Sequence, residues 1–347
     1  MTFVDELKSA VTPRAALLVV GVLALQLLFI ASYVGALHNP KPRDVPFGVV
    51  APQQVSAQLV GRLERLPGEP LDPRPVSDAD EARRQIMNRE IDGALLVNPA
   101  GSTDTLLVAS GGGTVLSSTL ESLFTTVEAA NRRTVRTVDV APASPQDFDG
   151  LSAFYLVVGW CVGGYICAAI LAISAGSRPA NTIRAVIRLG TLAVYSVIGG
   201  LGGAIIVGPI LGALPGSVAA LWGLGTLVVF AVGAATLALQ SVFGIVGIGL
   251  AILLIVVAGN PSAGGAFPLP MLPPFWNAIG PALPPGAGTW VARSIAYFKG
   301  NDVTGPLLVL SAWAVAGTAI TLVTASLKRK PQAEPIAREA GAQETGA

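Results

Sequence analysis

Ionisable side chains are missing from long stretches of this sequence. No Asp, Glu, Lys, Arg or His occurs from residue 189 to residue 292, and charged residues make up only 12% of the chain. With 52% hydrophobic residues and a mean hydropathy of +0.64, the chain is too apolar for a soluble protein of 347 residues and is typical of a membrane protein. The net charge of +1, without any basic stripe, gives no support to a nucleic-acid partner.

The residues that usually carry metal or nucleophile chemistry are also scarce. The only histidine, His38, comes directly after the first apolar run, and no zinc-ligand spacing occurs. Cys161 and Cys167 are six residues apart in one apolar run, so they face different sides of a helix and cannot pair. No lysine follows a glycine, which excludes the phosphate-binding motif G-x-x-x-x-G-K-[ST]. We therefore expect no enzyme activity, cofactor or metal in this chain.

Long uncharged runs predict six transmembrane helices. The first, Ala15–Leu37, has 23 residues, enough to cross about 30 Å of hydrocarbon at about 1.5 Å per residue. It is longer than the apolar core of a signal peptide, so we interpret it as a retained span. The five further predicted spans cover residues 152–176, 189–214, 217–239, 242–259 and 305–327. Only Gln240 and Ser241 separate the third and fourth of these five.

Most of the charged residues lie between the first two spans, at residues 39–150. Short β-rich runs alternate there with amphipathic helical patterns in the order β-α-β-α-β-β-α-β. Ser77-Asp78-Ala79-Asp80 reads like a capping box that opens the second of these helices. About 110 residues can bury one core, so the pattern predicts an α/β domain inserted into an α-helical polytopic membrane protein.

A proline-rich stretch at residues 260–300, here called the broken segment, precedes the last span. Its prolines forbid one continuous helix and leave room for two short ones, at about 275–280 and 287–298. Broken backbone at membrane depth is tolerated only when it is buried in protein or lines a water-filled cavity. We therefore predict a re-entrant or interfacial element that forms an external gate, with Phe275, Trp276, Trp290 and Arg293 as candidate gate or substrate-path residues.

Basic residues in short loops set the predicted orientation. Arg178, Arg184 and Arg188 lie between the second and third spans, and residues 328–330 (Lys-Arg-Lys) come after the last one. Placing both groups in the cytoplasm puts both termini inside the cell and residues 39–150 outside it. The membrane that we predict for the chain is the plasma membrane of a bacterium. Residues 1–14 fit either a surface-lying helix or a frayed terminus, and the polar tail at 328–347 is predicted to be disordered.

Two stretches also carry a family resemblance. The runs PFGVV and VSDADEARRQIMNREIDGALLVNP in the inserted domain, and NPSAGGAFPLPMLPPFWNAIGPALPPGAGTWVARSIAYFKGN before the last span, combine with a topology of one span, a large external domain and five further spans. In these features the chain resembles the type 2 ABC transporter permeases, nearest to the YhgE/Pip-like membrane proteins. The resemblance implies an exporter of a hydrophobic or amphipathic compound or an envelope component. It also implies a homo- or heterodimer of permease subunits with separate ATP-binding cassette ATPase subunits.

Three alternatives stay open at this point. Arg178, Arg184 and Arg188 either form the docking surface for that ATPase or only fix the topology. The chain is either the permease or an envelope scaffold, assembly or receptor protein that acts through its external domain. Glycine pairs such as Gly159 with Gly163 and Gly199 with Gly203 fit close packing within the bundle or a dimerisation motif, and their abundance favours packing.

Overall fold

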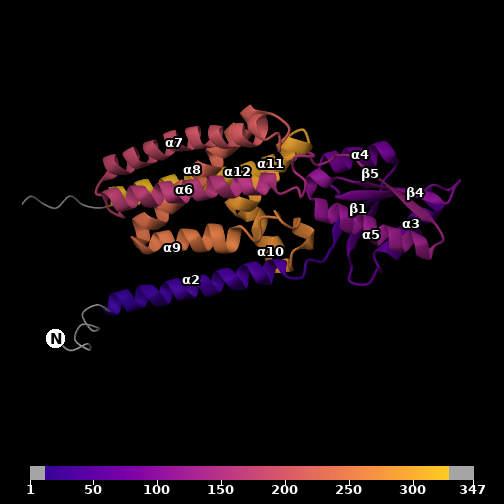
Figure 1. Ribbon diagram of the computed structural model, residues 1–347, viewed down its shortest axis with the longest axis horizontal. Coiled ribbons are helices and arrows are strands. Elements are labelled where there is room, and N and C mark those ends of the chain that lie inside the picture. The colour runs from indigo at the N-terminus through magenta and orange to yellow at the C-terminus, as the bar shows by residue number, and fades with distance from the viewer. Residues whose placement is uncertain (1–11, 328–347) are drawn as a thin grey trace, which may run out of the picture.

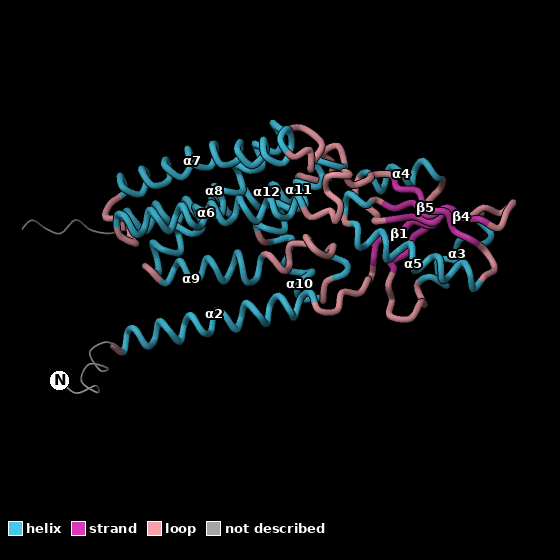
Figure 2. The backbone as a smooth tube through the Cα atoms, in the orientation of Figure 1, coloured by secondary structure: helices cyan, strands magenta, loops and turns pink. Residues whose placement is uncertain are grey.

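The computed structural model describes residues 12–327 and has two parts, a bundle of helices and a small sheet domain at one end of it (Figure 1). The predicted disordered tail at 328–347 lies outside the described residues. The predicted surface helix at 1–14 also lies outside them, except for residues 12–14. Backbone tubes show the strands confined to the sheet domain (Figure 2).

Five helices of the described chain are long and apolar enough to cross a membrane. They are α2 (Pro13–Leu37), α6 (Ser152–Ala175), α7 (Thr182–Ile205) with its π-helical continuation η2 (Ile206–Ile210), α8 (Val218–Phe243) and α12 (Thr304–Ser326). Polar residues cap the starts of α7 and α8: Asn181 accepts from the Arg184 amide at 2.9 Å, and Ser217 accepts from the Ala220 amide at 3.2 Å. The prediction of a helical, polytopic membrane protein is therefore supported.

The predicted span at 242–259 takes a different form. Helix α8 continues through Gln240 and Ser241, so the turn expected there is displaced to Gly244, whose φ of 67° is left-handed. Beyond this turn lie α9 (Val246–Ile252) and the π-helical η3 (Leu253–Gly259), of seven residues each. At about 1.5 Å per residue they cover roughly 21 Å, less than the roughly 30 Å of a bilayer core. A sixth span is thus not confirmed and stays a prediction.

Small residues allow the central helices to approach closely. A Cβ built on Gly203 of α7 would lie 2.4 Å from Nε1 of Trp160 on α6, and one on Gly163 would lie 2.9 Å from the Tyr195 hydroxyl. Their partners in the two motifs, Gly159 and Gly199, meet nothing closer than 4.0 Å. One glycine of each pair therefore faces a neighbouring helix of the same chain, which supports the packing interpretation.

The sheet domain has the element order that the sequence predicts. Its strands are β1 (Val45–Val50), β2 (Leu71–Pro75), β3 (Gly93–Leu96), β4 (Thr103–Val108) and β5 (Thr134–Asp139), and its helices are α3 (Gln53–Leu63), α4 (Ala79–Met87) and α5 (Thr114–Ala130). The five-stranded sheet has the order β2-β1-β3-β4-β5, with only β3 and β4 antiparallel. The helix-forming pattern of α4 begins at Asp78, which accepts from the amides of Asp80 and Glu81.

The two faces of this sheet have different roles. Helices α3 and α5 cover one face, where Phe47 and Phe124 stack at the centre of a separate core with ring centroids 4.7 Å apart. On the other face, Ala82 and Ile86 of α4 belong to the same buried cluster as Tyr297 and Phe298 of the membrane region. The sheet domain and the bundle therefore share a core and are not joined only by linkers.

The broken segment forms the floor on which the sheet domain rests. It contains η4 (Leu269–Met271), α10 (Pro274–Ile279), η5 (Gly280–Ala282) and α11 (Pro284–Tyr297), so both predicted short helices are present. Helix α11 packs against α6, α8 and α12, and the 3-10 turn η1 (Ser110–Gly112) of the sheet domain packs on it. Its contact with η1 is close, because a Cβ on Gly111 would lie 2.5 Å from the Tyr297 ring.

Candidate functional site

A cavity of about 240 Å³ lies where the sheet domain meets the broken segment. We call it the interface pocket. Segments that are far apart in sequence form it: the start of β1, the chain after α4, the loop before η4, helix α10 and one side of α11. Its charged lining side chains are Arg89, Asp92 and Arg293.

Arg89 enters the interface pocket from the sheet domain. It lies just after the end of α4 with a left-handed φ of 62°, and its side chain contacts α11. Its guanidinium carbon lies 3.4 Å from the centre of the Trp290 ring, and Nη1 donates to the Trp290 carbonyl at 2.9 Å and to Ser294 Oγ at 2.7 Å. Burial, followed by the positive charge of Arg293, lowers the pKa of Arg89 to about 9.

Arg293 reaches the same pocket from α11 and is only 4% exposed. Nη1 donates to the Gly264 carbonyl at 2.6 Å, and Nη2 donates to the carbonyls of Gly265 at 2.7 Å and Gly150 at 3.1 Å. The buried Nε has no hydrogen-bond partner. Arg293 thus ties the broken segment to the chain entering α6 through neutral carbonyls, and the carboxylate whose charge acts on it is that of Asp147.

Asp92 is the one carboxylate among the charged side chains of this pocket. Burial raises the pKa of Asp92 to about 6, although the nearby Arg89 charge acts in the opposite direction. No ion pair within 4.0 Å joins either arginine to a carboxylate in the part of the chain that the structure describes. The lining of the pocket therefore holds two arginines and one aspartate without a direct ion pair, and the charges of Asp147 and Asp302 act on these arginines from outside the lining.

The four candidate gate residues divide into two pairs. Trp290 and Arg293 both line the interface pocket, and the Trp290 indole also donates to the Asp302 carbonyl at 2.9 Å. Phe275 and Trp276 lie on α10, where their rings meet edge to face with centroids 5.1 Å apart, and Phe275 is 64% exposed. Neither of these two lines the pocket.

Sequence reasoning missed Arg89. It lies in a run of charged residues at the end of a surface helix, and nothing in that run distinguishes it from Arg83 and Arg84, which pair with acidic residues of α4 itself. The structure distinguishes Arg89 by its left-handed backbone. The sequence does not show this conformation, because the residue is not a glycine.

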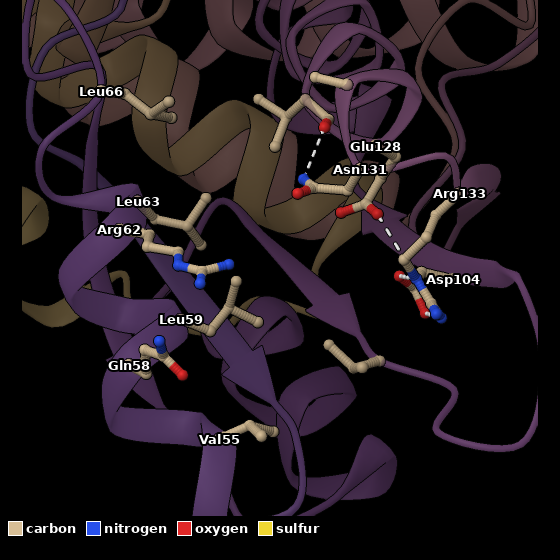
Figure 3. Close-up of a pocket in the computed structure, with 13 residues that line it drawn as sticks. Val55, Gln58, Leu59, Arg62, Leu63, Leu66, Asp104, Glu128, Asn131 and Arg133 are labelled. Atoms are coloured by element: carbon tan, nitrogen blue, oxygen red, sulfur yellow. Dashed lines mark hydrogen bonds and ion pairs between the residues drawn. The ribbon is translucent and has the colours of Figure 1, made fainter.

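A second cavity, of about 460 Å³, lies within the sheet domain (Figure 3). We call it the domain pocket. Apolar side chains of α3, among them Leu59 and Leu63, form one wall, and the last turn of α5 forms the other. Asp104, Glu128 and Arg133 form its charged floor.

The charged lining of the domain pocket consists of Asp104, Glu128 and Arg133 on its floor and of Arg62 on α3. Arg133 donates to both oxygens of Asp104, at 2.6 and 2.7 Å, and its Nε lies 3.7 Å from Glu128 Oε2. Burial acts to raise the pKa of Asp104, but the hydrogen bonds from Arg133 and the Asn98 amide outweigh it and hold that pKa low. Burial, followed by the Asp104 charge, raises the pKa of Glu128 to about 7.

A third cavity, of about 460 Å³, is a lateral groove between α6 and α7 at the end nearest the sheet domain. Its lining includes Gly159, Trp160 and Gly203 and contains no Asp, Glu, Lys, Arg or His. Tyr155 and Leu211 at its margin are 63% and 57% exposed, so the groove opens on the outer surface of the bundle.

The three arginines at the junction of α6 and α7 have different environments. Arg188 is 5% exposed and donates to the carbonyls of Ala175 and Gly176 at 2.8 and 2.6 Å, which completes the end of α6. Arg178 donates to the Val242 carbonyl at the end of α8, at 2.8 Å. Arg184 is exposed. Two of the three candidate docking residues thus satisfy carbonyls at helix ends.

Within residues 12–327, no group of three or more His, Cys, Asp or Glu side chains is placed to hold a metal ion, and Cys161 and Cys167 are free. Comparison with protein families, with curated proteins and with solved structures found no match to this chain. The resemblance to type 2 ABC transporter permeases therefore rests on the residues and the topology alone.

Proposed function

We propose that the chain is the membrane-spanning permease subunit of an ATP-driven exporter of a hydrophobic or amphipathic compound or an envelope component. The observation that carries this proposal is the lateral groove between α6 and α7, which is apolar, uncharged and open on the bundle surface. A compound dissolved in the bilayer could enter it without crossing water, and the groove offers no Asp, Glu, Lys, Arg or His for coupling to protons or sodium.

The energy source is then a separate subunit, because the chain contains no G-x-x-x-x-G-K-[ST] motif. Arg184 is the best candidate for contact with that ATPase, since Arg178 and Arg188 are occupied at helix ends. A second permease subunit, identical or related, would complete the exporter. The proposed location is the plasma membrane of a bacterium, with both termini and Arg184 on the cytoplasmic side and the sheet domain outside the cell.

The first test is purification of the chain from its native membrane in a mild detergent. The proposal expects an ATP-binding cassette ATPase to co-purify, and Arg184→Glu to release it while the chain keeps its thermal unfolding temperature. An intact complex without an ATPase, together with unchanged compound accumulation on deletion of the gene, contradicts the proposal.

The second test blocks the groove. A side chain at Gly159 meets no atom within 4 Å of its Cβ, so Gly159→Leu fills the groove without disturbing the backbone. Gly190→Leu on α7 is the matched control, because its Cβ also meets nothing and it lies outside the groove. We expect export to fall with the first variant and to stay unchanged with the second. Equal export by both would remove the groove from the pathway.

The domain pocket favours one other function, that of an envelope scaffold, assembly or receptor protein acting through its sheet domain. A cavity of about 460 Å³ with apolar walls and a charged floor is of the size and character of a small-molecule site. Under this alternative Leu59→Trp, which fills the domain pocket, abolishes function, whereas Gly159→Leu leaves it intact.

A further inference from the structure

The interface pocket contains two guanidinium groups, that of the buried Arg293 and that of the partly buried Arg89, and no carboxylate of the described chain lies within 4.0 Å of either. The Arg293 side chain is almost fully removed from solvent, and its three hydrogen bonds end on neutral carbonyls. Arg89 binds a carbonyl, a hydroxyl and an aromatic face. The opposite charges that act on them, those of Asp92 and Asp302 on Arg89 and that of Asp147 on Arg293, make no direct ion pair with them. A desolvated charge without a direct partner is costly, and proteins normally pair such groups.

One hydrogen-bond donor of this site is left unused. Nε of Arg293 is buried and without a partner, although a guanidinium normally uses its donors when it is removed from water. The pocket beside it measures about 240 Å³, far more than the roughly 10–15 Å³ that one water molecule requires. The space and the unused donor therefore occur at one place, on a guanidinium group that has no direct ion pair.

The depth of the pocket also bears on its ligand. The Trp290 indole, which stacks on Arg89, donates to the carbonyl of Asp302, two residues before α12 begins at Thr304. The chain that follows α2, which ends at Leu37, contacts η4 beside the pocket, because the Lys41 amide donates to the Met271 carbonyl at 3.3 Å. Where spanning helices end, the phosphate groups of a surrounding bilayer lie.

We propose that the interface pocket binds a phosphate group, held between the guanidinium groups of Arg89 and Arg293. Guanidinium is suited to this ligand, because its planar N–H groups match the oxygens of phosphate and its charge pairs with the anion. Asp92 is the one charged side chain of the lining that opposes an anion, and Asn277 adds an amide from α10. The phosphate comes either from a lipid headgroup or from solution, and the site does not depend on whether the chain transports anything.

The test uses the full chain, stripped of lipid in an uncharged detergent, with thermal unfolding as the readout. One arm titrates inorganic phosphate at constant ionic strength against chloride. The other titrates dihexanoyl phosphatidic acid below its micelle concentration against neutral dihexanoylglycerol. We expect saturable stabilisation by a phosphate compound and none by its control. Stabilisation by the lipid alone identifies a headgroup site, whereas stabilisation by inorganic phosphate as well identifies a general phosphate site.

Variants of Arg89 decide whether the effect arises in this pocket. Arg89→Gln should raise the half-saturating concentration at least tenfold, and Arg89→Lys, which keeps the charge, should restore much of the affinity. Arg83→Gln is the charge-matched control on α4, where Arg83 is exposed and lies 3.5 Å from Asp80, and it should bind as the wild type does. The half-saturating concentration is compared rather than the unfolding temperature, because loss of the Trp290 contact lowers the baseline.

The proposal is overturned if neither phosphate compound stabilises the chain saturably. It is equally overturned if Arg89→Gln and Arg83→Gln bind alike, since the phosphate would then lie elsewhere. Arg293→Lys is a second test within α11. Lysine keeps the positive charge but lacks the planar N–H groups of guanidinium, so we expect weaker binding of phosphate. If that variant does not fold, the Arg89 series alone decides.

Discussion

The contact between Arg89 and Trp290 should carry a measurable part of the attachment of the sheet domain to the bundle. Two opposing terms meet there. The stacked guanidinium at 3.4 Å and its hydrogen bonds stabilise the attachment, whereas burial and the charge of Arg293 lower the pKa of Arg89 to about 9 and so weaken it. The effect of removing Arg89 alone is therefore a difference of two terms and does not measure the contact.

A double-mutant cycle separates the two terms. To a first approximation, the desolvation cost of Arg89 is the same whether Trp290 or a leucine faces the guanidinium. This cost therefore cancels when Arg89→Met, Trp290→Leu and the double variant are compared. The remaining energy is the stacking of a desolvated cation on an indole ring, about 2 kcal/mol. At about 1.4 kcal/mol per factor of ten, this corresponds to roughly 30-fold in an opening equilibrium.

Amide hydrogen exchange of α4 and β3 measures that opening, because these elements are the part of the sheet domain that faces the bundle. We expect exchange in the double variant to be roughly 30-fold slower than the product of the single effects predicts. Arg83→Met combined with Trp290→Leu is the control cycle and should be additive, since an exposed pair with Asp80 is worth little. Additive effects in the Arg89 cycle as well would show that the contact between Arg89 and Trp290 does not hold the sheet domain on the bundle.

Three further predictions concern single residues. Because the pKa of Asp92 is raised to about 6 in the folded chain, its contribution to stability is present below pH of about 4 and is lost as pH rises through 6. Asp92→Asn should weaken the dependence of the unfolding temperature on pH between about 4 and 6. An unchanged pH profile would contradict the raised pKa of Asp92. Arg188→Ala leaves two carbonyls at the end of α6 without their donor and should cost about 2–4 kcal/mol in denaturant unfolding. Arg184→Ala should cost less than about 0.5 kcal/mol, and equal losses would contradict the assignment. Gly203→Ala places its Cβ against an indole and should destabilise the bundle by about 1–3 kcal/mol in the same assay, whereas Gly190→Ala should not. A tolerated Gly203→Ala would mean that α6 and α7 separate easily.

The elements that could be predicted from the sequence are those that local patterns specify. Alternation and helical spacing determine the order of strands and helices in the sheet domain, and prolines determine where the broken segment interrupts the bundle. The predicted turn at Gln240 and Ser241 is wrong because these residues are polar enough to suggest a loop, yet both are buried in α8. Hydropathy could not show that the next apolar run is short and partly π-helical, because π-helical turns depend on packing.

The candidate site shows the same limit. Trp290 and Arg293 could be selected because they lie in an unusual stretch, but their partner Arg89 is 201 residues away from Trp290 in the sequence. No spacing rule connects residues at that distance, since only the tertiary fold brings α4 onto α11. Arg188 has a structural role that its place in the sequence does not show, and its docking role stays a prediction. A basic residue in a short loop suggests a docking surface, whereas its side chain completes the end of its neighbouring helix.

The contacts of Arg89 with α11 also restrict how the broken segment can act as a gate. Arg89 holds Trp290 and Ser294 of α11, and Asn301 donates to the Met87 carbonyl at the end of α4, at 3.0 Å. Helix α11 therefore cannot move away from α4 unless these contacts break or the sheet domain moves with it. A gate of this kind opens by displacement of the whole domain, so its equilibrium depends on whatever occupies the interface pocket between them. A disulfide that fixes α4 to α11 should then stop export even though it lies outside the lateral groove. Full export by the locked chain would show that the broken segment is a structural floor and not a gate.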